Sequence, residues 1–593
     1  MRSGGMQTGG MQTQRNTSLL GAPFRIAGRV RRVTLADLVI AVAVLVALYG
    51  IVSVGRGVGV SFAPESNLSI DTSIRNLPYY GVRSLIRMFI ALFVSLVFSF
   101  VYAYAAARSR RAAKVLIPAL DILQSVPILG FLSVTVTGFM ALFPGSLLGL
   151  ELASIFAIFT SQAWNMTFSF YHSLLMTPTD LDEMSRLLGL SRWQRFWRVD
   201  APSGVIGLVW NGMMSMGGGW FFLVASEAIS VSNRNYSLPG VGSFAGAAIA
   251  DGDLHKVLWA ILTMAVLVIG VNVLFWRPLV AWSEMFRYET SQSATMARSF
   301  VLDLLRRSHW PRALGRLRRR ISVPIDRVMS RLLGTDSGQL VAEEADRRNG
   351  DIVFWVLVGG LTGFGAWRAL SFITAVDGFA VFWRPFWLGA VTFLRVAVLI
   401  VISTIIWVPI GAKVGLNPRA AQIAQPLVQV LASFPANFLF PFATFVFIRT
   451  GLSLNVGGIL LMALGAQWYI LFNAIAGAME IPNDLREAMS DLGVQGWQLW
   501  RRLILPGVFT SYVTGGISAA GGAWNASIVS EIVTYGGTTL TATGLGAYIA
   551  LATESGDMHE VLAGIAVMSF YVVSSNRLFW QPLYSRAKER FAL

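Results

Sequence analysis

Residues 481–506 have the sequence IPNDLREAMSDLGVQGWQLWRRLILP, and this stretch decides how the chain is organised. Residues 177–202, TPTDLDEMSRLLGLSRWQRFWRVDAP, align with it without a gap at an offset of 304 positions. Such a register does not arise by chance, so the chain contains an internal repeat. The matched positions are Asp180, Leu181, Glu183, Leu188, Gly189, Trp193, Gln194, Arg198 and Pro202 in the first copy, and Asp484, Leu485, Glu487, Leu492, Gly493, Trp497, Gln498, Arg502 and Pro506 in the second.

Each copy is expected to fold as two short helices around a glycine. Thr179 and Asn483 are expected to cap the first helix. Gly189 and Gly493 fit the left-handed position that ends it. Because long apolar segments flank both copies, we expect each to form a compact polar elbow at a membrane surface. An ordinary interhelical loop is the alternative, and it explains one copy better than two copies in register.

The composition indicates a polytopic membrane protein. The chain has 593 residues, of which 55% are hydrophobic and 13% charged, and its mean hydropathy is +0.61. Soluble domains are about a quarter charged. The net charge of +16 is carried mainly by arginine, which in a membrane protein indicates cytoplasmic loops rather than nucleic-acid binding. The absence of cysteine excludes disulfides and thiolate metal ligands, and the four dispersed histidines predict no metal site.

About twelve apolar segments reach or exceed the roughly 20 residues that a membrane-spanning helix needs. Arginines in the loop between the second and third spans place that loop in the cytoplasm. Counting the spans from this loop places both elbows and both termini in the cytoplasm as well. The expected spans lie near 35–54, 84–107, 115–142, 146–176, 203–230 and 256–280, and near 351–375, 386–412, 423–449, 455–478, 506–534 and 559–583. The expected domains are a disordered cytoplasmic tail (1–34), a first transmembrane domain (35–280), a cytoplasmic basic linker (281–350), a second transmembrane domain (351–583) and a cytoplasmic tail (584–593).

The repeat extends well beyond the elbows and predicts two homologous six-helix halves, so the fold class is all-α. Both halves have the same topology, and we therefore expect a pseudo-twofold axis along the membrane normal. Upstream of the elbows the offset becomes 308, which places one insertion or deletion between the third and fourth spans. Matched pairs are Trp220 with Trp524, Glu227 with Glu531, Gly242 with Gly546, Pro127 with Pro435, and Arg87 with Arg395.

The linker between the halves carries a basic run with a single acid, Asp326. Such a helix-forming run could bind anionic lipid headgroups at a membrane surface. A solvated tether is the equal alternative. The arginines of the run are Arg306, Arg307, Arg312, Arg316, Arg318, Arg319, Arg320, Arg327 and Arg331.

At Glu487-Ala488-Met489, with Gly493 and Pro506 following, the chain resembles the EAA loop of binding-protein-dependent ABC transporter permeases. In that family the loop docks into a groove of a cytoplasmic ATPase subunit. Both copies depart from the two alanines of the family pattern, with Met184-Ser185 in the first and Ala488-Met489 in the second. The first copy also departs from the pattern at Asp200-Ala201-Pro202. The resemblance implies that the ATPase-coupling residues are Asp180, Glu183, Gly189 and Trp193, with Asp484, Glu487, Ala488, Gly493 and Trp497.

The run Ala523 to Glu531, followed by the stretch 544–549, resembles the nitrate, sulfonate and taurine branch of these permeases. That resemblance implies a type I importer fold in a bacterial or archaeal plasma membrane, two cytoplasmic ATPases and an extracytoplasmic substrate-binding protein. It also implies uptake of a small anion. Duplicated permeases for ferric iron or a thiamine-like vitamin precursor remain an alternative, as does an ATP-independent channel or membrane enzyme.

Polar residues within the spans are the candidates for a substrate path, because their burial in lipid is costly. The sequence contains no phosphate-binding loop, so ATP and Mg²⁺ must be bound by partner subunits, and no catalytic residue is expected. Glu227 and Glu531 are expected to be structural or gating residues bonded to backbone amides of the glycine-rich loop that follows each. The path candidates are Gln124, Ser125, Asn211 and Ser215, with Gln429, Ser433, Asn437, Ser518 and Asn525; hydrogen bonding between helices is the alternative role for each.

The expected topology can be tested by thiol labelling, because the chain has no cysteine of its own. Single cysteines at Ser191, Gln495 and Ser337 should resist a membrane-impermeant thiol reagent in intact cells and react after permeabilisation. Labelling of either elbow from outside would show that the topology is wrong.

Overall fold

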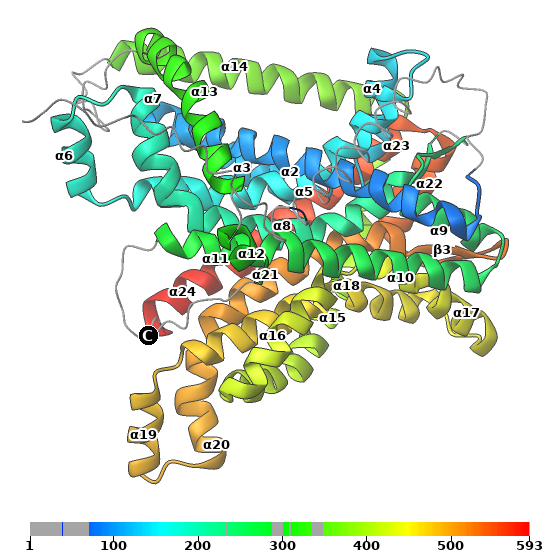
Figure 1. Ribbon diagram of the computed structural model, residues 1–593. Helices are drawn as coiled ribbons and strands as arrows, with labels where there is room; N and C mark the ends of the chain where they lie inside the picture. Colours follow the sequence, from blue (N-terminus) through cyan, green and yellow to red (C-terminus); the bar gives the residue numbers. More distant parts are fainter. Residues whose placement is uncertain are drawn as a thin grey trace, which may run out of the picture.

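The computed structural model describes residues 38, 70–231, 234–286, 300–307, 310–333 and 348–591. Two sets of long helices repeat the same order and lie side by side, with the elbows at the left of Figure 1 and the small strands at the right. The first half consists of α2 (Leu77–Arg108), α3 (Arg110–Ser125), α4 (Leu132–Leu142), α5 (Leu148–Leu175), α6 (Thr179–Leu187), α7 (Arg192–Arg195), α8 (Ala201–Glu227), β1 (Ala228–Val231), β2 (Arg234–Ser237), α9 (Val241–Ala250), α10 (Leu254–Val271) and α11 (Arg277–Ser283).

The second half repeats this order element by element, which confirms the all-α, two-half fold. It consists of α15 (Trp383–Gly415), α16 (Pro418–Ser433), α17 (Phe440–Thr450), α18 (Leu454–Glu480), α19 (Asn483–Asp491), α20 (Gly496–Leu499), α21 (Leu505–Ser530), β3 (Ile532–Tyr535), β4 (Thr538–Thr541), α22 (Leu545–Ser555), α23 (Met558–Ser575) and α24 (Gln581–Phe591). Between the halves lie α12 (Phe300–Arg307), α13 (Trp310–Leu333) and α14 (Arg348–Ile373).

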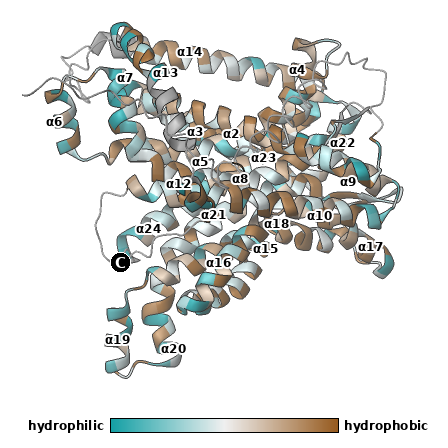
Figure 2. Cartoon of the chain, in the orientation of Figure 1, coloured by the Kyte–Doolittle hydropathy of each residue, from teal (hydrophilic) through white to brown (hydrophobic). Residues whose placement is uncertain are grey.

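Seven helices among the described residues are long and apolar enough to cross a membrane, or eight if one bent pair is a single span. Figure 2 shows the apolar residues concentrated on these long helices, with hydrophilic residues on α6 and α19. The expected first span, 35–54, and the tail, 1–34, lie outside the described residues apart from residue 38.

Two expected spans, 115–142 and 423–449, are each two helices separated by a break. In the second half the two parts are bent by 79°. The residue before each proline, Val126 or Phe434, has the extended backbone that a following proline favours. Pro127 and Pro435 therefore stand just after the point where each helix ends, and the apolar composition alone concealed the break.

The expected spans 203–230 and 506–534 end earlier than predicted, because each is followed by a small antiparallel hairpin. Strand β1 pairs with β2, and β3 pairs with β4, at the end of the molecule opposite the elbows. The hairpins cross between the halves: the Tyr535 hydroxyl donates to the Gly252 carbonyl over 3.1 Å. The chain therefore closes over this end with segments from both halves.

The break segments interlock the two halves. Ile128, Leu129 and Leu132 pack in the hydrophobic core of the second half, and Phe438 packs in that of the first. The Ile128 amide also donates to Asn525 Oδ1 over 2.8 Å. On the other side α16 packs on α8, where a Cβ on Gly217 would stand 2.6 Å from Ser433 Oγ. Each half thus completes the core of the other.

Wide, π-type turns recur at matched positions in both halves. One pair covers Phe196–Asp200 and Trp500–Ile504, and the other covers Asn272–Trp276 and Asn576–Trp580. Because both pairs keep the 304-residue offset, the repeat extends to local helix geometry. Such turns place an extra residue in the helix and redirect the side chains that follow.

Candidate functional site

Both elbows have the predicted helix, glycine and helix order. Gly189 has φ of +59° and Gly493 has φ of +69°, and a Cβ at either position would meet nothing within 4 Å. The requirement for glycine therefore comes from the left-handed backbone and not from crowding. The Val494 amide then donates to the Met489 carbonyl over 2.9 Å, which closes the helix end.

The predicted caps at Thr179 and Asn483 are wrong. Both residues are the first of their helices, and the cap positions are Pro178 and Pro482. The extended backbone of Pro178 directs its carbonyl to the Leu181 amide, 3.1 Å away. The proline carbonyl thus accepts the first helical hydrogen bond without any capping side chain.

The tips of both elbows expose large apolar side chains at the surface of the molecule. Leu187 and Leu188 in the first elbow are 88% and 67% exposed, and Leu492 and Trp497 in the second are 77% and 71% exposed. Exposed apolar residues on a polar element are typical of a surface that binds another protein.

The two elbows differ in what surrounds their second helix. In the first elbow, Trp193 Nε1 donates to Asp326 Oδ1 of α13 over 2.9 Å. The hydroxyls of Ser191 and Ser330 lie 2.8 Å apart. Trp193 is therefore partly covered by the linker helix, whereas its counterpart Trp497 is exposed. No pattern in the sequence indicates this contact.

Buried ion pairs fix the first elbow but have no counterpart in the second. Arg195 is 2% exposed and pairs with both Asp182 and Asp200, and Arg108 Nη2 lies 2.7 Å from Asp200 Oδ2. A buried cation needs such partners. In the second elbow Leu499 stands at the position of Arg195, and Arg486 and Ile504 stand at those of Asp182 and Asp200. Leu416 stands at the position of Arg108. These four residues line a cavity of about 380 Å³.

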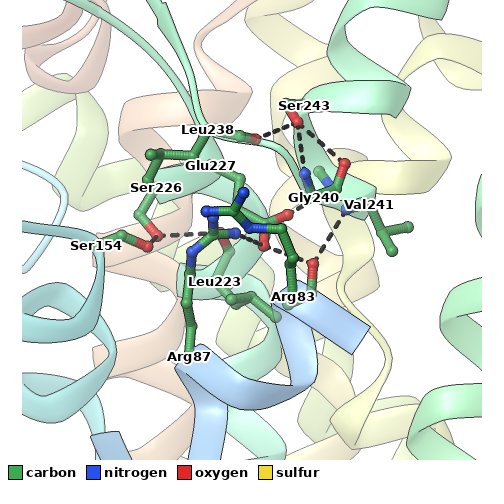
Figure 3. Close-up of polar contacts among 12 residues, drawn as sticks. Arg83, Arg87, Ser154, Leu223, Ser226, Glu227, Leu238, Gly240, Val241 and Ser243 are labelled. Carbon is green, nitrogen blue, oxygen red and sulfur yellow. Dashed lines mark hydrogen bonds and ion pairs between the residues drawn. The ribbon is translucent and has the colours of Figure 1, made fainter. Parts of the chain in front are cut away.

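At the hairpin end, Glu227 is the centre of a buried polar network in the first half (Figure 3). Its Oε1 lies 2.7 Å from Arg87 Nη1 and accepts from the Ser84 hydroxyl. Its Oε2 accepts from the Gly242 amide over 2.7 Å. Glu151 pairs with the same Arg87, at 2.8 Å from Nη2. One carboxylate therefore joins α2, α8 and α9.

Glu531 has the corresponding role in the second half. It lies 2.8 Å from Arg395 Nη1 and accepts from the Gly546 amide over 2.8 Å. Asn455 replaces Glu151 here and accepts from Arg395 Nη2 over 2.7 Å. Sequence reasoning expected the amide bonds of the glutamates but missed their arginine partners. The signal was available, because Arg87 and Arg395 are themselves a matched pair of the repeat.

The path candidates lie in different surroundings. Asn211 donates to Ser169 Oγ and to the Gly207 carbonyl, both over 3.0 Å, so it joins two helices of one half. Asn525 accepts from a backbone amide of the other half. Ser215 and Asn437 are buried or half-buried, Ser125 bonds the carbonyl of Asp121, and Gln124 and Ser518 are exposed.

Gln429 and Ser433 are brought together on α16. They line a small cavity, about 10 Å³ in volume, against Met213, Gly217 and Tyr469. The lining residues come from both halves, so this cavity lies where the two halves meet. Sequence reasoning missed Tyr469, which has no tyrosine counterpart in the first half.

A protein family described as "Binding-protein-dependent transport system inner membrane component" matches residues 95–277 and again residues 405–579. Together these two matches cover more than half of the sequence. The chain belongs to this family. The chain is therefore a multi-pass inner membrane protein with the family domain present twice, as the internal repeat predicted.

Individual relatives align with about a third of the chain. The nitrate import permease protein of Leptolyngbya laminosa is 26% identical over 193 residues, which cover 32% of this chain and 66% of the relative. The bicarbonate transport system permease protein of Synechococcus elongatus is 27% identical over 180 residues, covering 30% and 62%. The taurine transport system permease protein of Escherichia coli is 25% identical over 180 residues, with the same coverage. The chain thus spans just under two thirds of the length of these curated relatives.

The polar network makes a prediction about stability. Arg395→Gln removes the guanidinium that compensates the buried Glu531 carboxylate, and truncating one partner of a buried pair costs about 3–5 kcal/mol. We expect a clear fall in the midpoint of thermal unfolding of the purified membrane protein. Arg368→Gln, on the exposed face of α14, is the matched control. Equal midpoints for the two variants would contradict the structural role of the network.

Proposed function

We propose that the chain is the fused membrane subunit of an ATP-driven importer for a small anion. The observation that carries the proposal is the pair of elbows at one end of the molecule, each attached to one copy of the transport domain. Two elbows provide docking sites for two ATPase subunits, and the elbow end is then the cytoplasmic side. ATP and Mg²⁺ belong to those subunits.

The opposite end suits an extracytoplasmic substrate-binding protein. At that end β1 contacts α22 of the other half and β3 contacts α9, and the polar networks of Glu227 and Glu531 hold the following loops in place. A binding protein that contacts both halves at this end would control the release of its substrate into the path.

The anion assignment rests on the relatives and on the chemistry of the interface between the halves. The relatives carry names for nitrate, bicarbonate and taurine transport. The side chains of Gln429, Ser433 and Tyr469 offer neutral hydrogen-bond donors. Neutral donors can hold an anion weakly and release it, which transport requires, while high affinity belongs to the binding protein.

Coupling depends on the bend of the second elbow. Gly493→Val places a β-branched residue at φ of +69°, a conformation that costs an L-residue about 1–2 kcal/mol or more. We expect substrate-stimulated ATP hydrolysis and uptake to fall together, while the membrane domain still folds. Gly270→Val, in α10 where an added Cβ meets nothing within 4 Å, is the control. Wild-type stimulation in Gly493→Val would mean that the elbow is an ordinary loop.

The substrate class is tested by uptake in a strain without other importers, with the cognate ATPase and binding protein present. Labelled nitrate, bicarbonate and taurine form one group, and ferric iron, a thiamine precursor and a neutral sugar form the other. ATP-dependent uptake of an anion is expected. Uptake restricted to the second group would contradict the anion assignment and leave the importer assignment intact.

A further inference from the structure

A large apolar cavity lies in the first half beneath the linker helix α13. Its volume is about 1040 Å³, and its walls come from α2, α8, α11 and α13. On α2 it is lined by Leu92, Leu96 and Phe100, and on α8 by residues from Ala201 to Gly212. At 1.5 Å per residue, the lining stretch of α8 is about 17 Å long. The cavity is thus elongated along the spanning helices, from the elbow into the membrane region.

The apolar character of this cavity is specific to the first half. Trp197, Trp282 and Phe286 line it, and the matched positions of the second half carry Arg501, Arg586 and Arg590. Val205 and Leu208 also line it, where the second half has the larger Phe509 and Tyr512. The repeat therefore shows which residues keep the space open and apolar, and which would fill it.

Helix α13 closes the elbow end of the cavity. Ile325 and Asp326 form part of the lining, and the Asp326 carboxylate also accepts from Trp193. Val328 and Leu332 of α13 are 53% and 71% exposed. A helix that combines arginines with exposed apolar residues is typical of one that lies at a membrane surface.

The described side chains at this end of the cavity carry positive charge. Asp326, the one acid of α13, already accepts a hydrogen bond from Trp193. Arg327 and Arg331 are exposed, and Arg198 lines the cavity. An occupant with an apolar chain inside and an anionic group outside fits both the cavity and its rim.

We propose that this cavity is a binding site for an anionic phospholipid, with an acyl chain between α2 and α8 and the headgroup at Arg327 and Arg331 of α13. The site also places that lipid against the first elbow, because Trp193 of that elbow lines the cavity and donates a hydrogen bond to Asp326 of α13. The proposal does not depend on which substrate the protein transports.

Photo-crosslinking of the full-length chain in lipid nanodiscs tests the proposal. The probe is phosphatidylglycerol with a diazirine in its acyl chain, and phosphatidylcholine with the same chain is the comparison. We expect labelling at Leu96 and Phe100, with about fivefold preference for the anionic probe per arginine that contacts the headgroup. Phe93 and Val101, each 67% exposed on α2, report contact with bulk lipid. Labelling of those two alone, or equal labelling by both probes, would overturn the proposal.

Variants taken from the repeat sharpen the test. Val205→Phe with Leu208→Tyr introduces the residues of the second half and should reduce labelling at Leu96 and Phe100 several-fold, with labelling at Phe93 unchanged. The reverse exchange, Phe509→Val with Tyr512→Leu, is the matched control and should leave labelling of the first half unchanged. Arg327→Gln with Arg331→Gln should abolish the preference for the anionic probe and retain acyl-chain labelling. Unaltered labelling in the filled variant would place the lipid elsewhere.

The position of α13 is tested separately by a disulfide. Ser191→Cys with Ser330→Cys should form a disulfide under mild oxidation, because the two hydroxyls lie 2.8 Å apart and the chain has no other cysteine. Gln495→Cys with Ser330→Cys, which uses the matched position of the second elbow, should not. Failure of the first pair to crosslink would remove α13 from the cavity and overturn the proposal even if the filled variant does not fold.

Discussion

The cost of burying a carboxylate shapes each half of this protein. Glu227 and Glu531 are both fully buried, and a charge in that position must be compensated by charge and hydrogen bonds. Arginine from α2 or α15, a hydroxyl from the same helix and a backbone amide from the glycine-rich loop provide this compensation. Three elements must come together before either carboxylate is satisfied, so the network fixes the arrangement of the half around it.

This requirement also explains the glycine pattern that follows each glutamate. A Cβ on Gly242 would lie 2.6 Å from the Val224 carbonyl, and one on Gly240 would overlap the Glu227 carboxylate. In the second half a Cβ on Gly544 would overlap the Glu531 carboxylate, and one on Gly546 would overlap the Ser527 carbonyl. The glycines are thus needed for close approach, because the amide can reach the carboxylate only when no side chain intervenes.

Much of this architecture could be predicted from one sequence because the sequence contains the same half twice. Recurrence at a fixed offset identified the elbows, the left-handed glycines and the buried glutamates. The breaks before Pro127 and Pro435 were missed because hydropathy does not register a change of direction inside an apolar run. The hairpins were missed because four-residue strands carry little periodic signal. The packing of α13 over Trp193 could not be predicted at all, because it depends on a tertiary contact between segments more than a hundred residues apart.

The interlocked break segments have a consequence for how the protein assembles. Since Ile128 and Leu129 pack in the second half and Phe438 packs in the first, neither half can bury all its apolar surface until the other has been synthesised. In a transporter made from separate subunits, that step would be a bimolecular search within the membrane. Here the linker makes it an intramolecular step with a high effective concentration of the partner half. The fusion therefore ensures that two halves that have diverged at their elbows always assemble as one unlike pair, and never as two copies of the same half.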